Sequence, residues 1–564
     1  MRILLLCHGF NSLTQRLHCD LRAAGHEVSV EFDVNDAVTA EAVSLFQPDL
    51  ILAPFLKRAI PAEVFEKTLC LIVHPGPIGD RGPSALDWAV LEDENEWGVT
   101  VLQAVKDLDA GPIWAHRSFP LRKASKSSLY RHEVTDAAAS AVFEALEKLE
   151  AGAQPEPLDS ACSRWRPSVK QSERVINWEI DTTATILQKI RSADGMPGLL
   201  DNLFDEPVRL FDARPFDGPI PCSLTPGTPF ARSGPALALK TTDGALWIGH
   251  GKKTSETSIK LPMTQVFEDE CVDLPDLPDG YKDILFEIED GVSYLHFDFY
   301  NGAMGTDACR RLKDAFEEAA ASPAKVLILM GGSDHWSNGL NLNLIEAARS
   351  PAEESWQNIQ AIDDLAEAVI RTTDKWIISG LRGNAGAGGV FLARAADEIW
   401  IRPQTILNPH YKDMGNLYGS EYWTYLLPKY AGPDNAARIS EARLPMGAEE
   451  ALALGLADKV LGAGQKSFEA EVRERASALA QTDLTDRLQQ KADTRERDEA
   501  VKPLETYRAA ELAKMRKNFF GFDPSYHVAR YNFVRKVVKS RTPRSLAHHR
   551  SSPSGQPVTS RALP

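Results

Sequence analysis

The chain has 564 residues, a formal net charge of −16 and 43% hydrophobic residues, so several folded domains are expected. The negative charge argues against nucleic acid as a partner, because that binding depends on clustered Lys and Arg. No apolar run approaches the ~20 residues of a membrane span. The seven scattered cysteines indicate neither a disulfide framework nor a metal site, which suits a cytoplasmic location.

Residues 1–152 alternate short apolar runs with helical segments, a pattern typical of a parallel sheet with crossover helices. Strands are predicted at 2–7, 28–32, 50–53 and 71–74, followed by a long helix at 126–149 and a linker containing Pro and Gly. Residues 162–262 form a second module, whose alternating final segment predicts a small β-barrel. We therefore expect a Rossmann-like α/β domain followed by a smaller β domain.

An acidic stretch at 267–283, broken by Pro and Gly, predicts the main domain boundary. Beyond it, an alternating strand, an amphipathic helix and a buried strand begin another α/β domain at 280–480. Residues 481–540 are predicted to be helical. Residues 541–564 are rich in Ser, Pro and Arg, a composition that predicts a disordered tail.

The first group of candidate functional residues follows the strand predicted at 71–74. His74 ends that strand, a turn rich in Pro and Gly leads to Arg81 and Gly82, and Asp109 follows beside Gly111. The carboxyl ends of parallel strands bind ligands in α/β sheets, and a His near a carboxylate suits proton transfer. A His beside a turn is more often a local hydrogen-bonding residue, so spacing alone leaves both interpretations open.

These segments resemble the formyltransferase family that uses 10-formyl-tetrahydrofolate, whose motifs are Asn-x-His-Pro, a downstream Arg-Gly and Asp-x-Gly. The resemblance implies that His74 and Asp109 are catalytic and that Arg81 and Gly82 belong to the folate site. Ile72 stands where the family has Asn, whose amide would donate to the oxyanion of the intermediate. The amino-terminal domain of 10-formyl-tetrahydrofolate dehydrogenase has a similar apolar residue and passes formyl to a thiol, so a thiol acceptor is expected.

A second group of candidate residues lies in two Gly-containing turns that follow predicted strands, at 337–340 and 386–389. The second turn opens a helix, so its N–H groups point outward at the positive end of the helix dipole. Two such amides directed at one carbonyl oxygen form an oxyanion hole. Tight packing of a helix on a sheet explains a single Gly-rich turn equally well.

Together with their flanking segments, these turns resemble the crotonase (enoyl-CoA hydratase/isomerase) superfamily over residues 280–480. The resemblance implies that the amides of Leu340 and Gly388 bind the thioester oxygen of an acyl-CoA. The residues that would shape the surrounding channel are Ser337, Asn338, Gly339 and Gly389.

The two glutamates of a hydratase fall at Phe391 and His410, so the usual base for hydration is missing. Four titratable residues lie nearby: His410, Tyr411, Asp413 and Glu421. We predict Tyr411 as the acid and Glu421 as the base. A hydrogen-bonded wall residue is an equally good interpretation of either one.

Formyl-CoA is the simplest molecule that both predicted domains could hold. It has no α-carbon, so removing its only carbon-bound hydrogen and expelling the thiolate would release carbon monoxide. This combination of domains resembles the HypX (also HoxX) family of hydrogenase maturation factors over nearly the whole chain. The resemblance implies 10-formyl-tetrahydrofolate and coenzyme A as cofactors, a role in making the CO ligand of NiFe hydrogenase, and other maturation proteins as candidate partners.

Two alternatives remain open at this point: a formyl-folate hydrolase or transferase with a non-catalytic CoA-binding domain, and a non-catalytic scaffold for maturation proteins. Phosphate-binding residues are predicted from weaker signals. Ser12, Gln15 and Arg16 follow the first strand at a helix start, a position suited to phosphate. Arg131 and Arg191 are further candidates.

Overall fold

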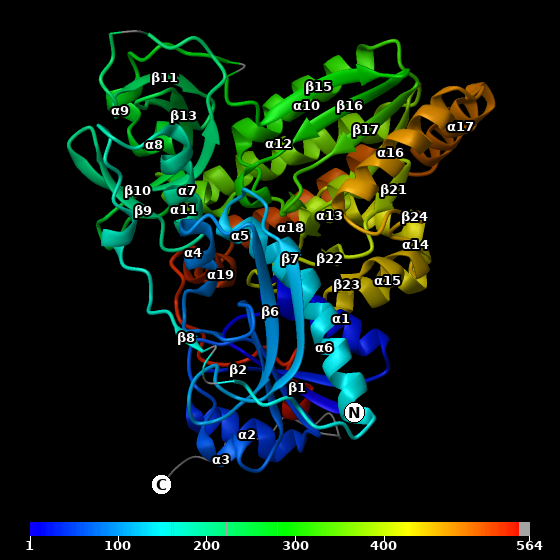
Figure 1. The fold of residues 1–564 in the computed structure, drawn as a ribbon. Helices are drawn as coiled ribbons and strands as arrows, with labels where there is room; N and C mark the ends of the chain where they lie inside the picture. Colours follow the sequence, from blue (N-terminus) through cyan, green and yellow to red (C-terminus); the bar gives the residue numbers. More distant parts are fainter. Residues whose placement is uncertain (160, 162, 222, 279, 552–564) are drawn as a thin grey trace. The chain divides into compact units, whose positions relative to one another are not determined.

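The computed structural model describes residues 1–159, 161, 163–221, 223–278 and 280–551, and the chain divides into two compact units (Figure 1). The first unit comprises residues 1–258 and 262–281 and the C-terminal segment from 538. The second comprises 259–261 and 282–537. The second unit is therefore inserted in the sequence of the first. No helix in the described ranges has the length and apolar composition needed to cross a membrane.

The first unit begins with a six-stranded sheet in the order β2-β1-β3-β4-β6-β7. The first four strands pair in parallel, and β6 and β7 extend the sheet in antiparallel fashion. All four strands predicted from the sequence form, because their apolar residues are buried in the sheet. The strands are β1 (Arg2–Cys7), β2 (Glu27–Phe32), β3 (Leu50–Phe55), β4 (Cys70–His74), β6 (Glu96–Gln103) and β7 (Ile113–Pro120).

Helices cover this sheet. Helices α2 (Asp36–Phe46) and α3 (Ala62–Phe65) share an apolar cluster with β1, β3 and β4. Helices α1 (Ser12–Ala23) and α6 (Thr135–Glu150) pack against each other and against the sheet (Figure 1). The long helix predicted at 126–149 is present as three successive pieces: α5 (Lys126–Leu129), a π-helical turn (Tyr130–Val134) and α6. The α/β fold class predicted from the sequence is confirmed.

The second module of this unit is an antiparallel sheet in the order β11-β12-β13-β10-β9, with β14 paired to β13. Helix α7 (Thr183–Ala193) contributes to its apolar core. Helix α4 (Ala85–Leu91) of the first module packs against α7. The strands are β9 (Leu199–Leu203), β10 (Glu206–Pro215), β11 (Pro229–Ser233), β12 (Ala236–Lys240), β13 (Ala245–Lys253) and β14 (Leu261–Pro262).

The second unit is built on a sheet in the order β15-β16-β17-β19-β21-β24, with a smaller sheet β18-β20-β22-β23 beside it. Alternate side chains of the large sheet enter two different cores. Leu295 and Phe297 pack with α10 (Thr306–Ala321) and α12 (Pro351–Arg371), whereas Val292 and Tyr294 pack with α16 (Gln465–Ala480). The strands are β15 (Ile284–Glu289), β16 (Val292–Phe297), β17 (Val326–Met330), β18 (His335–Ser337), β19 (Trp376–Leu381), β20 (Asn384–Gly386), β21 (Glu398–Ile401), β22 (Ile406–Asn408), β23 (Met446–Gly447) and β24 (Lys459–Val460).

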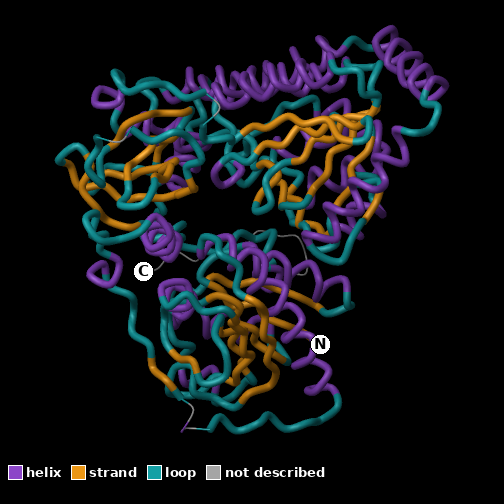
Figure 2. Tube along the Cα trace, turned by 45° about the horizontal axis from the view of Figure 1, so that its top comes forward, coloured by secondary structure: helices purple, strands orange, loops and turns teal. Residues whose placement is uncertain are grey.

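Helices complete the second unit. Figure 2 shows the helices of the chain in purple and its strands in orange. Helix α13 (Gly388–Arg394) follows β20, and α18 (Leu504–Phe520) packs on α12 and on α14 (Trp423–Ala442). The remaining helices are α11 (Leu342–Ala347), α15 (Ala448–Ala453), α17 (Thr485–Val501) and α19 (Ser525–Val534). The helices α17, α18 and α19 fall in the segment predicted to be helical.

The prediction of a disordered tail over 541–564 is wrong for its first part, while residues 552–564 lie outside the described residues. In the first unit, Val30 N–H donates to Leu546 O (3.0 Å) and Phe32 N–H donates to Thr542 Oγ1 (2.7 Å). Glu31, which is fully buried, accepts from His549 Nε2 at 2.9 Å and from Arg550 Nε at 2.6 Å. The prediction from composition failed because this segment needs no core of its own. A few polar contacts to the edge strand β2 are enough to order it.

Candidate active sites

His74 ends β4 and lies between two carboxylates of the first unit. Its side chain is 4% exposed, its Nε2 lies 2.9 Å from Asp80 Oδ2, and its Nδ1 lies 3.7 Å from Asp109 Oδ2. The carboxylate at Asp80 is at hydrogen-bonding distance and can fix the tautomer and orientation of the imidazole. The structure therefore brings His74 and Asp109 together, with Asp80 as a third member that the sequence reasoning missed.

The turn after His74 has room only for glycine at position 76. A Cβ on Gly76 would lie 2.4 Å from Asp80 Oδ2 and 2.5 Å from His74 Nε2. The turn is held from β6, where Thr100 Oγ1 donates to Gly76 O (2.8 Å) and Trp97 Nε1 donates to Pro75 O (2.9 Å). The close approach of His74 and Asp80 thus depends on the missing side chain between them.

The loop that carries Asp109 is fixed by the residues predicted from the Arg-Gly motif. Gly82 N–H donates to Asp109 Oδ2 (3.0 Å), and Arg81 Nε donates to Leu108 O (3.0 Å). Asp109 has a φ of 53°, in the left-handed region. A Cβ on Gly111 would lie 1.8 Å from Gln103 O, so this turn also requires glycine. Arg81 and Gly82 therefore position Asp109.

Asp80 is supported by Arg166, a second residue that sequence reasoning missed. Arg166 Nε lies 3.0 Å from Asp80 Oδ1, and Arg166 Nη1 donates to Glu92 Oε2 at 2.6 Å. Both Asp80 and Arg166 are buried. Asp80 lies inside the motif that pointed to His74, but nothing in the sequence links it to a residue 86 positions away.

Ile72 lies two residues before His74 on β4, so both side chains project from the same face of the strand. Ile72 is half-buried and packs against the apolar cluster shared by β1, β3, α2 and α3. Its aliphatic side chain leaves the position without the amide donor of the related motif.

The residues predicted to bind phosphate all lie in the first unit. Ser12 opens α1, which is capped by Asn11 Oδ1 accepting from Thr14 N–H (3.0 Å). Gln15 Nε2 donates to Phe10 O (2.9 Å), and Arg16 Nε donates to Asp20 Oδ2 (2.5 Å). Arg16 already has an acidic partner, so Ser12 and Gln15 at the helix start suit an anion better.

Arg131 lies in the π-helical turn and Arg191 in the last turn of α7. Burial, together with the nearby charge of Arg122, lowers the pKa of the Arg191 guanidinium. A bound anion would relieve both effects. Arg191 therefore keeps its place as a candidate anion ligand.

Among the described residues, nothing accepts from the N–H groups of the two predicted oxyanion donors of the second unit. Met304 N–H donates to Gly339 O (2.8 Å) and Asn341 N–H donates to Met304 O (3.2 Å), so the chain on either side of Leu340 is fixed while Leu340 N–H is not used. Gly388 is the first residue of α13, where backbone N–H groups lack helical partners. Within the described ranges neither amide has an acceptor.

The neighbouring turn residues bring these amides close together. A Cβ on Gly339 would lie 3.3 Å from Gly388 N, and a Cβ on Gly389 would lie 2.2 Å from Ser337 O. Ser337 Oγ accepts from Gly339 N–H (3.0 Å), and Asn338 Nδ2 donates to Asn301 O (2.8 Å). Ser337, Asn338, Gly339 and Gly389 therefore shape the turns that carry Leu340 and Gly388.

Glu421 lies directly against Gly388. A Cβ on Gly388 would lie 2.1 Å from Glu421 Oε1. Glu421 Oε2 accepts from Tyr411 Oη (2.6 Å) and from Ser420 N–H (3.1 Å), which leaves Oε1 on the side of the Gly388 turn. Burial, followed by the charge of Asp363, raises the pKa of Glu421 to about 8. The structure thus brings Glu421, Tyr411 and the predicted oxyanion donors together.

Phe391 and His410 are the residues predicted to stand where hydratases have glutamates. The Phe391 ring stacks on Tyr411, with centroids 5.5 Å apart and an interplanar angle of 18°. His410 is half-buried, and burial lowers the pKa of its imidazole. Asp413 is exposed. Phe391 therefore fixes the Tyr411 ring, and the titratable pair next to the free amides is Tyr411 with Glu421.

Two further buried carboxyls, which sequence reasoning missed, contact the turn that carries Glu421. Asp363 of α12 accepts from Glu421 N–H (2.7 Å), and Glu511 of α18 accepts from Tyr422 N–H (3.0 Å). Burial raises the pKa of Asp363 to about 7 and that of Glu511 to about 8. No local motif marks them, because each lies in a helix far from Glu421 along the chain.

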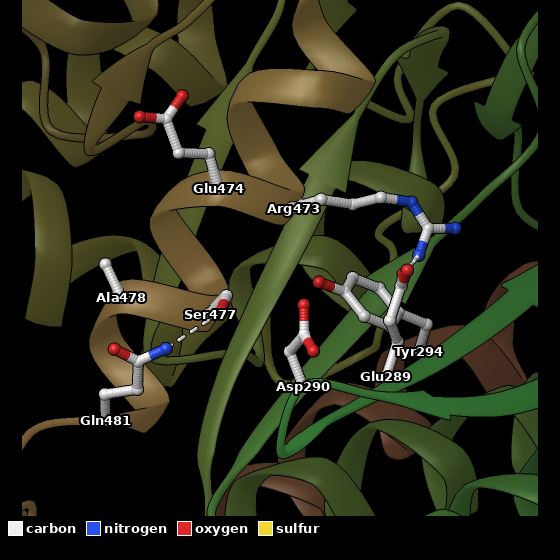
Figure 3. A pocket seen from close by; sticks show the side chains of 8 residues that line it. All are labelled: Glu289, Asp290, Tyr294, Arg473, Glu474, Ser477, Ala478 and Gln481. Atoms are coloured by element: carbon white, nitrogen blue, oxygen red, sulfur yellow. Dashed lines mark hydrogen bonds and ion pairs between the residues drawn. The ribbon is translucent and has the colours of Figure 1, made fainter.

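The second unit also has a hollow of about 300 Å³ at the end of β15 and α16 (Figure 3). It is lined by Glu289, Asp290, Tyr294, Arg473, Glu474, Ser477, Ala478 and Gln481. Its one cation, Arg473, pairs with Glu289 and lies 2.6 Å from Glu287. This charge is already neutralised, and no residue predicted for either site lines the hollow, so it offers no cation for a phosphate.

Comparison with known proteins finds three family models on the chain. A formyl transferase model matches residues 31–146, a formyl transferase C-terminal model matches 168–264, and an enoyl-CoA hydratase/isomerase model matches 287–532. The hydrogenase maturation factor HoxX of Bradyrhizobium diazoefficiens is 56% identical over 99% of both chains. The chain belongs to the HypX/HoxX family. The resemblance inferred from the sequence is thereby confirmed.

Solved structures of this family share the fold. HypX from Aquifex aeolicus, crystallised in complex with tetrahydrofolic acid, is 45% identical, with a TM-score of 0.94 over 98% of this chain and 99% of that one. The methionyl-tRNA formyltransferase of Pelobacter propionicus is 25% identical and matches only 44% of this chain and 79% of its own length. As a HypX/HoxX family member, the chain thus combines formyltransferase and crotonase-like domains.

Proposed function

We propose that this protein transfers the formyl group of 10-formyl-tetrahydrofolate to coenzyme A and then decarbonylates formyl-CoA to carbon monoxide. The CO would serve as a ligand of the NiFe-hydrogenase active site. The observation that carries the proposal is the second site, where Leu340 N–H and Gly388 N–H have no acceptor among the described residues, their turns lie close together, and Glu421 Oε1 lies against Gly388. Membership of a hydrogenase maturation family supports the role of the product.

In the first reaction, the CoA thiol attacks the formyl carbon, the bond from carbon to N10 breaks, and the thiol proton ends on N10 of the folate. His74 and Asp109 are the residues that would move this proton. Ile72 leaves the oxyanion without the amide donor used by related enzymes, which favours a thiol as acceptor. A folate is supported by the tetrahydrofolic acid bound to the Aquifex aeolicus relative.

In the second reaction, the amides of Leu340 and Gly388 would hold the thioester oxygen. Glu421 takes the proton from the formyl carbon, the electron pair of that bond stays on carbon, and the carbon–sulfur bond breaks with its pair on sulfur. Tyr411 hydrogen-bonds to Glu421 (2.6 Å) and would pass the proton on to the thiolate. The products are CO and CoA thiol, and no atom is left over.

The phosphates of CoA require cations or helix N-termini. For CoA bound at the first site, the candidates are Ser12, Gln15, Arg16, Arg131 and Arg191 of the first unit, of which Arg16 would have to leave Asp20. We further propose a cytoplasmic location and contact with other NiFe-hydrogenase maturation proteins, which would receive the CO.

The test is to incubate the purified protein with 10-formyl-tetrahydrofolate and CoA while deoxyhaemoglobin traps CO. We expect carboxyhaemoglobin to form in step with tetrahydrofolate. Glu421→Gln should slow CO release by on the order of 100- to 10,000-fold but still allow formyl-CoA to accumulate. Formate without CO would instead indicate a formyl-folate hydrolase with a non-catalytic CoA domain, and an absence of folate turnover would indicate a maturation scaffold.

A further inference from the structure

Three carboxyls from three elements of the second unit converge on the turn before α14, but the proposed reaction uses only one of them. Asp363 comes from α12, Glu421 from the turn and Glu511 from α18, and each is at most 1% exposed. Within the described ranges neither Asp363 nor Glu511 forms an ion pair. Buried carboxylates without a cation are costly, so these two residues need an explanation.

The Ser420 hydroxyl links Asp363 and Glu511. Ser420 Oγ lies 2.7 Å from Asp363 Oδ2 and 3.3 Å from Glu511 Oε2. A hydroxyl has one hydrogen to donate, so it can satisfy two carboxyls only if it donates to one and accepts from the other. The shorter contact fits donation from Ser420 Oγ to Asp363, and the longer one fits donation from a protonated Glu511 to Ser420 Oγ. Glu511 Oε2 also accepts from Tyr422 N–H (3.0 Å).

The remaining oxygens of these two carboxyls hold the backbone of the turn. Glu421 N–H donates to Asp363 Oδ1 (2.7 Å), and Thr424 N–H and Oγ1 donate to Glu511 Oε1 at 2.8 and 2.5 Å. The turn needs this support, because Glu421 and Tyr422 both have a φ of 59°. Non-glycine residues in that region are strained and persist only where their surroundings fix them.

We propose that Asp363 and Glu511 are positioning residues that share one proton through Ser420, and that the single negative charge they keep sets the basicity of Glu421. This inference rests on the proposed role of Glu421 in decarbonylation. The shared proton halves the charge buried beside Glu421, while the other contacts hold Glu421 Oε1 against Gly388.

The other groups around Glu421 fit this assignment. Tyr411 donates to Glu421, and Cys309 of α10 is a neutral thiol because burial raises its pKa. Arg508 of α18, whose charge acts on Asp363, pairs with Asp364 and Glu367. Burial also raises the pKa values of both Asp363 and Glu511 into the neutral range. Asp363 raises the pKa of Glu421 more than Glu511 does.

Because Asp363 influences Glu421 more than Glu511 does, removing each carboxyl should change the pH profile of CO release from formyl-CoA in a different way. In Asp363→Asn the remaining charge moves to Glu511, the weaker influence, so the rising limb should shift by about one pH unit to lower pH. In Glu511→Gln the charge stays on Asp363, so the limb should stay in place or shift to higher pH. Equal shifts to lower pH would indicate two independent charges, and no shift in either variant would indicate a purely structural role; each result overturns the proposal.

Infrared spectroscopy of inactive protein tests the shared proton without any turnover. Glu421→Gln removes the third carboxyl, so a carboxylic-acid carbonyl band at neutral pH should arise from Asp363 and Glu511. This band should be lost in the double variant Glu421→Gln/Glu511→Gln, because Asp363 then ionises. A missing band in the single variant, or a band that persists in the double variant, overturns the proposal even if other variants do not fold. Absence of CO from wild-type protein would instead refute the proposed function.

Discussion

Substituting Gly388 by Ala should disable decarbonylation through Glu421. The new methyl carbon would lie 2.1 Å from Glu421 Oε1 and 2.5 Å from Glu421 Cδ, so the carboxyl must move by about an ångström or more to restore ordinary van der Waals contact. Glu421 is buried and held by Tyr411 and Ser420. Misplacing a catalytic group by about 1 Å can cost on the order of 100-fold in rate. Alanine keeps its backbone N–H, so the oxyanion donor itself is chemically unchanged.

The assay is CO release from formyl-CoA, trapped by deoxyhaemoglobin. We expect Gly388→Ala to lose about 100-fold, and Glu421→Gln to lose on the order of 100- to 10,000-fold. The double variant should be no slower than Glu421→Gln, because both changes act on one group. Gly464→Ala in the same unit is the control, since its new Cβ meets nothing within 4 Å. Wild-type rates in folded Gly388→Ala would refute the assignment of Glu421 as the base.

Three further predictions concern the other site and stability. Asp109→Asn should slow formyl transfer from the folate by on the order of 100-fold or more, while CO release from added formyl-CoA should stay normal. Separate assays started from 10-formyl-tetrahydrofolate and from formyl-CoA measure the two rates. A chain ending at 540 should unfold about 3–5 kcal/mol more easily in thermal or urea melts, because buried Glu31 loses His549 and Arg550. The pKa values of Glu421 and Glu511 are raised to about 8 by burial, so the folded state binds more protons than the unfolded state from about pH 4 to 8. Stability from these groups is therefore lost as pH rises from about 4.5 to about 8, and the loss is complete above that pH. Glu511→Gln should reduce the slope of stability against pH over this range in melts at different pH, and a slope equal to that of wild type would contradict this.

The sequence by itself determined much of the architecture. Four parallel strands could be predicted because their residues are buried on both faces and read as apolar runs. The motifs around His74 and Gly388 could be predicted because turn geometry and close approach demand particular residues within a few positions. At Gly76 and Gly388, the structure supplies the reason: a side chain there would collide with Asp80 or Glu421.

Only the tertiary structure decided which distant residues complete each site. Arg166 contacts Asp80 from 86 positions away, and Glu511 contacts Ser420 from 91 positions away. Such contacts depend on how helices and strands pack, and the sequence carries no local pattern for them. Long-range contacts also decided the structure of the segment at 541–551. Its composition predicts disorder, but contacts to Glu31 order it. Local patterns mark the residues that chemistry and turns require, whereas burial and long-range contacts set their protonation and orientation.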